Sequence, residues 1–303
     1  MYDPYVGKKE RGSRAEAAPP AAGRSLHADE STLAAEWPWS KDAGGEDFGD
    51  HFETPKRAYR DIKPVLRKEA QRREIEESAL RLYDPYFCRG AMVTHLNSLG
   101  FANVINAKRD FYADIAADRV PAHDVLVTNP PYSGEHKAKL FAWLLEQHRA
   151  ALKAGGDCRP FMLLLPAWTA KWLPWRTFLW AMARLRSGKL DTTIEDAMEK
   201  AKKLSNLSDQ LEVNAEVFYL VNAGVFYLAP ETKYEYEAAV AAREEAPFFG
   251  VWFCGGFPDN ATREAAVAAI EKRASKEEKG TTACVIPTLR ALVEAGHAEM
   301  VKE

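Results

Sequence analysis

The feature that most constrains the fold is an apolar run that ends in Asn129-Pro130-Pro131-Tyr132. The run, residues 124–128, has the length and the β-branched content of a buried strand. The two prolines then end the strand, because each fixes φ and lacks a backbone N–H donor. A helix is predicted from about residue 135 to 153, with two glycines as its stop. A buried strand, a short loop and a helix in this order predict an α/β protein.

The same four residues resemble the active-site loop of S-adenosylmethionine-dependent amino-methyltransferases, which methylate planar nitrogens such as the adenine amine or the glutamine amide. The lone pair of such a nitrogen is delocalised, so an enzyme gains by favouring the pyramidal form as charge develops. The resemblance implies that the Asn129 side-chain oxygen and the Pro130 carbonyl accept the two N–H hydrogens. It also implies that Tyr132 stacks on the target. The alternative interpretation is a Pro-Pro turn that only ends a strand.

Residues 82–90 predict a strand and a tight turn, and a helix over 91–99 follows and ends at a glycine. This segment resembles the cofactor-binding loop of the same enzymes, whose pattern is Asp-Pro-Phe-x-Gly-x-Gly. Asp84, Tyr86 and Gly90 fit that pattern and are the cofactor-binding residues that the resemblance implies.

Two positions depart from the family pattern. Cys88 stands at the first glycine of the loop, where its Cβ is expected to crowd the methionine part of the cofactor. Asn106 ends a predicted strand over 103–106, where the family places an acidic residue that binds the ribose. The resemblance therefore implies a ribose contact from Asn106, and it implies a weakened cofactor site.

Two further positions complete the cofactor site that the resemblance implies. Asp110 begins an acid-aromatic segment that borders the cofactor adenine in the family, although it is equally suited to cap a short helix starting at residue 111. Thr54 and the proline after it predict a helix start. In the family, such a start closes over the methionine end of the cofactor. That helix is expected to reach about residue 78, with a break at Pro64.

Composition sets limits on the class of protein. The chain has 303 residues, a net charge of −3 and a pI of about 6.2, so any contact with nucleic acid must come from a local patch. No apolar run approaches the roughly 18 residues that span a bilayer, so no membrane insertion is expected. Four cysteines show neither a metal-site spacing nor Cys-x-x-Cys pairs. They favour a reducing intracellular compartment, cytoplasmic or nuclear before an organelle.

The chain is expected to divide into three parts: an extended or disordered arm (1–50), a methyltransferase-like domain (51–258) and a C-terminal helical extension (259–303). The arm carries aromatic residues and is expected to order only against its own domain or a partner subunit. Residues 56–73 are rich in basic side chains. These side chains form either a phosphate-binding surface or a solvent-exposed helix face, and the acidic residues interspersed among them favour the exposed face.

Strands and helices alternate through the rest of the chain. Strands are expected at 161–165 and 248–254, helices at 177–205, 260–278 and 287–303. A hairpin is expected from two strands, 216–221 and 224–228. Three tryptophans and a lysine lie between the strand at 161–165 and the helix at 177–205. They are expected either to line a substrate site or to pack in the core. They are Trp168, Lys171, Trp172 and Trp175.

The fold expected from these patterns is a Rossmann-like class I methyltransferase, with a mostly parallel sheet and helices on both faces. Three functions stay open. The first is methylation of adenine N6 in DNA or RNA. The second is methylation of glutamine N5 in a protein. The third is a non-catalytic subunit that keeps the fold as a scaffold in a larger complex. S-adenosylmethionine is the cofactor expected for the first two.

Overall fold

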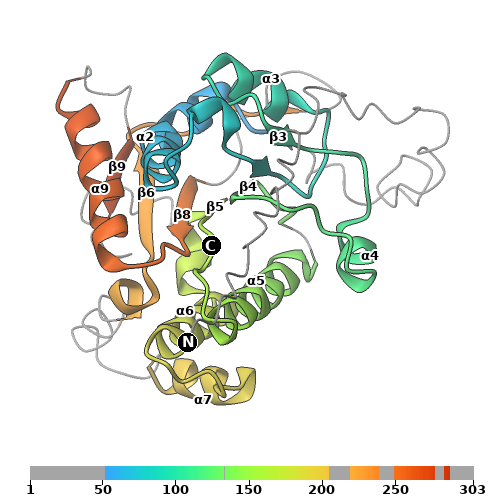
Figure 1. Cartoon of the computed structure of the whole chain (residues 1–303), viewed down its shortest axis with the longest axis vertical. Coiled ribbons are helices and arrows are strands. Elements are labelled where there is room, and N and C mark those ends of the chain that lie inside the picture. The colour runs from blue at the N-terminus through green and yellow to red at the C-terminus, as the bar shows by residue number, and fades with distance from the viewer. Residues whose placement is uncertain (1–51, 133, 205–218, 239–248, 277–282, 287–303) are drawn as a thin grey trace, which may run out of the picture. The chain divides into compact units, whose positions relative to one another are not determined.

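The computed structural model of the protein describes residues 52–132, 134–204, 219–238, 249–276 and 283–286. The predictions for the arm at 1–50 and for a helix at 287–303 lie outside these residues. Within the described part, a mixed seven-stranded sheet forms the centre of the fold (Figure 1). Its strands are β2 (Leu82–Tyr83), β3 (Val104–Ile105), β4 (Val125–Thr128), β5 (Phe161–Pro166), β6 (Phe226–Pro230), β8 (Gly250–Gly255) and β9 (Ala283–Ile286).

The strands lie in the order β3-β2-β4-β5-β8-β6-β9. From β3 to β5 all neighbours pair in parallel, whereas β8 is antiparallel to both β5 and β6, and β9 is antiparallel to β6. The predicted α/β class and its parallel core are confirmed, and the other half of the sheet is antiparallel.

The strand order reverses between β2 and β4. The chain passes from β2 to β3 on one side and then crosses to β4 on the other side of β2. Ligands of open α/β sheets bind at the carboxyl ends of the strands at such a switch point. The two loops that the sequence singles out follow β2 and β4, so both lie at the carboxyl end of these neighbouring strands.

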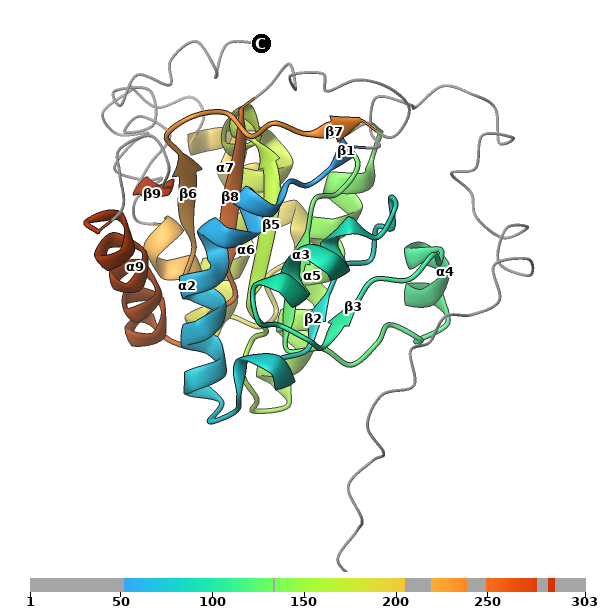
Figure 2. The ribbon, with the colours of Figure 1, turned by 90° about the horizontal axis from the view of Figure 1, so that it is seen from above.

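Helices cover both faces of the sheet, as expected (Figure 2). Helices α5 and α6 pack on the face that carries Leu163, and helices α2, α3 and α9 pack on the face that carries Leu164. The helices are α2 (Lys56–Arg72), α3 (Ala91–Ser98), α4 (Phe111–Ala116), α5 (His136–Lys153), α6 (Leu173–Arg186), α7 (Ile194–Leu204) and α9 (Asn260–Ala274). Short 3-10 turns, η2 (Glu77–Ala79) and η3 (Ala167–Lys171), and a two-stranded pair, β1 (Phe52–Glu53) with β7 (Glu237–Ala238), complete the described elements.

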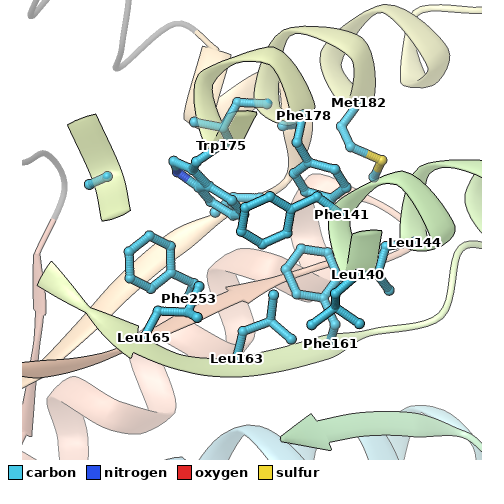
Figure 3. Close-up of a cluster of buried hydrophobic side chains, with 14 of the residues drawn as sticks. Leu140, Phe141, Leu144, Phe161, Leu163, Leu165, Trp175, Phe178, Met182 and Phe253 are labelled. Carbon is cyan, nitrogen blue, oxygen red and sulfur yellow. The ribbon is translucent and has the colours of Figure 1, made fainter. Parts of the chain in front are cut away.

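Aromatic and aliphatic side chains fill the core between the sheet and α5 and α6 (Figure 3). Phe161, Leu163 and Leu165 project from β5 to this side because side chains alternate along a strand. Phe141 from α5 and Trp175 from α6 pack against each other over these strand residues, with ring centroids 5.2 Å apart.

The predicted break at Pro64 is wrong, because α2 runs unbroken from Lys56 to Arg72. A proline inside a helix leaves the carbonyl four residues earlier without its N–H donor. That carbonyl belongs to Arg60, and the guanidinium of Arg273 on α9 donates to it. A tertiary contact therefore supplies the missing hydrogen bond.

The predicted hairpin is also wrong. Residues 219–223 are helical, and the strand after them, β6, pairs with β8 and β9. Gly224 has φ of +68° and ends this helical turn, with the Val225 N–H bonded to the Leu220 carbonyl at 2.8 Å. Residues 216–218 lie outside the described part of the chain.

The segment predicted as a C-terminal helical extension contributes helix α9, and it also contributes strand β9 to the main sheet. The sequence patterns did not reveal β9, nor the β1–β7 pair. In the described residues, no helix has the length and the apolar character needed to cross a membrane.

Candidate functional site

Two neighbouring strand ends are joined by a buried hydrogen bond. Asp84 follows β2 directly, and Thr128 is the last residue of β4. The Thr128 hydroxyl donates to the Asp84 carboxylate at 2.6 Å, and the Tyr86 N–H donates to the same oxygen at 3.0 Å. Burial raises the pKa of Asp84 to about 7, although both hydrogen bonds act in the opposite direction. This contact fixes the expected cofactor loop against the strand that carries Asn129.

A second carboxyl group borders the same loop. Glu53 of β1 is buried and accepts a hydrogen bond from the Arg89 N–H. Its charge contributes to the raised pKa of Asp84. Thr54, next along the chain, is also buried and hydrogen-bonds to Tyr59 of α2. The predicted helix start therefore lies beside the loop that was expected to bind the cofactor.

The loop accommodates Cys88 without backbone strain. The described non-glycine residues with positive φ are Glu74 and Asp118, so Cys88 keeps an ordinary conformation. Gly90, by contrast, has φ of +82° and begins α3, which explains why a glycine suits this position. Burial raises the pKa of the Cys88 thiol to about 12, and the neighbouring Glu53 adds to the effect. The thiol is therefore not ionised at neutral pH.

Asn106 and Asp110 serve the local backbone. The Asn106 amide donates to the carbonyls of Asp84 and Tyr86, at 3.2 and 3.4 Å. It ties the end of β3 to the loop after β2. The Asp110 carboxylate accepts from the N–H groups of Tyr112 and the residue after it, at 2.9 and 3.1 Å. The N-cap interpretation of Asp110 is confirmed.

A chain of three polar rings, which the sequence patterns did not reveal, lies beside the loop. The Tyr86 hydroxyl is 3.1 Å from the Tyr112 hydroxyl, and that hydroxyl is 2.8 Å from Nδ1 of His136. Burial raises the pKa of Tyr86 and of Tyr112 above the ordinary value. The three residues come from three separate segments, so local spacing carries no signal for this contact.

In the loop after β4, the side chain of Tyr132 forms a hydrogen bond with the side chain of Asn129. The Tyr132 hydroxyl lies 2.6 Å from Oδ1 of Asn129 and 3.2 Å from the Leu164 carbonyl of β5. The oxygen that the resemblance assigns to the target amine is thus occupied by a donor from the same loop. Pro130, between these two residues, is buried.

A buried lysine supports this loop from α5. Lys137 is 2% exposed and donates to the Tyr132 carbonyl. Its ammonium lies 5.7, 5.2 and 5.5 Å from the ring centroids of Tyr132, Trp168 and Trp172. These distances are those of cation–π contacts. The lysine at the site is therefore Lys137, whereas the predicted Lys171 is exposed.

The position of Lys137 has a sequence signal. It precedes Phe141 and Leu144 at the spacing of one helix face, and both of those residues are buried. A lysine on that face points into the structure. Trp175, also expected near a substrate, is fully buried and donates from Nε1 to the Tyr227 hydroxyl at 2.9 Å, so it belongs to the core.

Comparison of the chain with protein-family models, with curated proteins and with solved structures gives no match. The arrangement at the carboxyl edge of the sheet must therefore be interpreted from its own geometry. That geometry brings Asp84, Tyr86, Gly90 and Asn106 into one loop system, with Thr54 beside it. Asn129 and Tyr132 lie on the adjacent strand end, connected through Thr128.

Proposed function

We propose that the chain is an S-adenosylmethionine-dependent methyltransferase that acts on a planar amino nitrogen, with adenine N6 of DNA or RNA as its first substrate class. The observation that carries the proposal is the 2.6 Å hydrogen bond from Thr128 to Asp84. It holds the two expected loops, one for the cofactor and one for the target, on both sides of the switch point of the sheet.

The topology supports the same fold family. An antiparallel strand, β8, is inserted between β5 and β6, and β6 precedes it in the chain. The parallel strands β2, β4 and β5 keep the two expected loops at one end of the sheet, as a Rossmann-like methyltransferase fold requires. The fold alone does not fix the reaction, so the residues of the site carry the rest.

The charge of the site suits the cofactor. Asp84 and Glu53 place two buried carboxyl groups at the loop, and a negative potential there favours the cationic amino and sulfonium groups of S-adenosylmethionine. When bound, this cofactor supplies an electrophilic methyl group. Asp84, Gly90 and Thr54 would hold its methionine end, and Asn106, Tyr86 and Asp110 would border the nucleoside.

Asn129 is suited to hold the target nitrogen. Its side-chain oxygen accepts from Tyr132, and the Tyr132 hydroxyl has a second acceptor in the Leu164 carbonyl. Tyr132 can therefore turn its hydrogen to Leu164 and leave the Asn129 oxygen to an amine N–H. Acceptors aimed at both amine hydrogens stabilise the pyramidal nitrogen of the transition state. The nitrogen would gain the methyl group as the sulfur–methyl bond of the cofactor breaks, which leaves the neutral thioether S-adenosylhomocysteine, and it would then release one proton to water.

Two alternatives keep the same fold. The glutamine amide of a protein presents the same planar nitrogen, so N5 methylation uses the same residues. A non-catalytic scaffold is favoured by a different observation: Asn106 and Tyr86, both expected to face the cofactor, are bonded to the loop itself and to Tyr112.

A methyl-transfer assay separates the three functions. The full chain is incubated with methyl-labelled S-adenosylmethionine and, separately, with single-stranded RNA, single-stranded DNA, duplex DNA and a glutamine-containing peptide library. The proposal expects label in adenine N6 of a nucleic acid, and none with Asn129→Ala. Label in glutamine assigns the second function, and no label with any substrate, together with no cofactor binding, assigns the scaffold.

A further inference from the structure

A groove runs between α2 and α9, on the outer side of the helix layer. It has a volume of about 790 Å³, and alanines of α9 together with Pro64 and Leu99 form its apolar lining. The two helices are antiparallel. Arg273 near the end of α9 lies 3.7 Å from Asp61 near the start of α2, whereas the N-cap of α9, Asp259, is electrostatically coupled to Arg72 at the other end of α2.

Basic side chains line both walls of this groove. Helix α2 contributes Arg60, Lys63, Arg67 and Lys68. The end of α9 contributes Lys272, Arg273 and Lys276. Glu77 is the acidic residue among the described lining residues, and it pairs with Arg67. A chain with a net charge of −3 thus gathers seven cations along one groove.

Four of these cations, the lysines of the groove, form no ion pair with a carboxylate within the described residues. Arg67 pairs with Glu77, and Arg273 pairs with the buried Asp61. The charge of the remaining arginine, Arg60, also acts on Asp61. No ion pair within the described ranges involves the four lysines, which are Lys63, Lys68, Lys272 and Lys276. Like charges held this close repel one another, so the groove favours an anionic occupant.

We propose that this groove binds the sugar-phosphate backbone of a nucleic-acid strand. The helical rise of about 1.5 Å per residue separates Arg60 from Lys68 by about 12 Å. Cations spread over this length can face successive phosphates of one strand. No aromatic side chain lines the groove among the described residues, so the contacts are with phosphates and do not depend on base sequence.

The shape of the surface favours a strand over an anionic membrane. A membrane-binding face is flat or convex and presents large apolar side chains. The described large apolar residues that are exposed are Ile75, Ile194, Met198 and Val221, and none of them lines this groove. A concave track with cations on both walls fits a narrow polyanion.

The test is fluorescence anisotropy of a labelled 20-nucleotide single strand of mixed sequence, titrated with the full chain at several salt concentrations. No cofactor enters this assay, so its result does not depend on the proposed methyl transfer. If the four lysines each neutralise one phosphate, affinity falls about 50-fold between 50 and 200 mM salt, from a slope of about 0.7 per contact. In the double variant Lys63→Gln with Lys272→Gln, the same salt change lowers affinity only about sevenfold.

A matched control carries the same charge change on another part of the surface. Lys189→Gln with Lys202→Gln removes two exposed cations that do not line the groove, and it should behave as wild type. A second groove pair, Lys68→Gln with Lys276→Gln, should reproduce the loss. The proposal is overturned if the groove and control variants show equal salt slopes. It is equally overturned if poly-glutamate or phosphatidylserine vesicles bind as tightly as the oligonucleotide.

Discussion

The hydroxyl of Thr128 donates a 2.6 Å hydrogen bond to the carboxylate of Asp84, and both side chains are buried. The two residues stand at the ends of adjacent parallel strands, 44 positions apart in the chain. Through this bond the loop after β2 and the loop after β4 hold a fixed relative position. Local sequence patterns identify both loops, but the bond exists only because β2 and β4 are neighbours in the sheet.

Replacing Asp84 with asparagine should change how stability depends on pH. Burial holds the pKa of Asp84 at about 7 in the folded protein, against an ordinary value of 3.8. The folded state therefore binds this proton more tightly than the unfolded state does. As pH rises from about 4 to 7, ionisation lowers the free energy of unfolding of the wild type by up to about 1.4 kcal/mol per pH unit.

Asp84→Asn removes this ionisation and keeps an oxygen that can accept from Thr128. Urea unfolding should show that the free energy of unfolding of the variant rises relative to that of the wild type between pH 5 and pH 8. Above about pH 8 the difference should stay constant. Asp191→Asn, which changes an exposed carboxylate, is the control and should show no such trend. A constant difference between Asp84→Asn and the wild type at all pH values contradicts the assignment.

Asn129→Ala should abolish methyl transfer while leaving cofactor affinity nearly unchanged. The variant lacks the side-chain oxygen that is assigned to the target nitrogen. It therefore loses stabilisation of the transition state, and kcat should fall by about 10²–10³. Tyr132→Phe is the matched control, since it removes the hydroxyl that occupies the Asn129 oxygen and keeps the ring. More than half of wild-type activity in Asn129→Ala would exclude the amino-methyltransferase mechanism.

Cys88→Gly should tighten the binding of S-adenosylmethionine. Cys88 stands where the family places a glycine, so its removal leaves more room for the methionine end of the cofactor. Cys88→Ser keeps the Cβ and should bind as the wild type does. Isothermal titration calorimetry measures both, and weaker binding by Cys88→Gly than by Cys88→Ser shows that the Cβ of Cys88 does not crowd the site.

Replacing Trp175 with alanine should lower the free energy of unfolding more than replacing Trp168 does. Trp175 is fully buried and packs between α5 and β8, so Trp175→Ala should cost about 3–5 kcal/mol of unfolding free energy. Trp168 is partly exposed and contacts the Lys137 ammonium, so Trp168→Ala should cost about 0.5–2 kcal/mol. Chemical denaturation measures the free energy of unfolding of both variants. Equal losses contradict the assignment of Trp175 to the core and of Trp168 to the site.

The elements near the expected site could be predicted because their signals are local. The apolar run before Asn129 is strand β4, and the turn that ends in Gly90 leads into helix α3. Asp110 satisfies two N–H groups next to it in sequence, so its cap was predictable too. In each of these cases, neighbouring residues decide the conformation.

The failures have causes that lie far away in sequence. Helix α2 passes through Pro64 because Arg273, more than two hundred residues later, bonds the Arg60 carbonyl. The Asn222-Ala223-Gly224 segment ends a helical turn, and the Arg186 guanidinium bonds the Asn222 carbonyl at 3.0 Å. Strand β9 was missed because its four residues gain their partners only from β6. Each outcome depends on tertiary contacts that no local pattern contains.

The most direct test of the proposed function is a calorimetric titration of S-adenosylmethionine into the full chain and into Asn129→Ala. Asn129 is assigned to the target and not to the cofactor, so both proteins should give saturable binding of similar affinity, weakened by Cys88. Binding with a Kd below about 1 mM, equal within error in the two proteins, is the predicted result. Absence of saturation in the wild type at about 1 mM contradicts a cofactor site at this loop and leaves the scaffold function in its place.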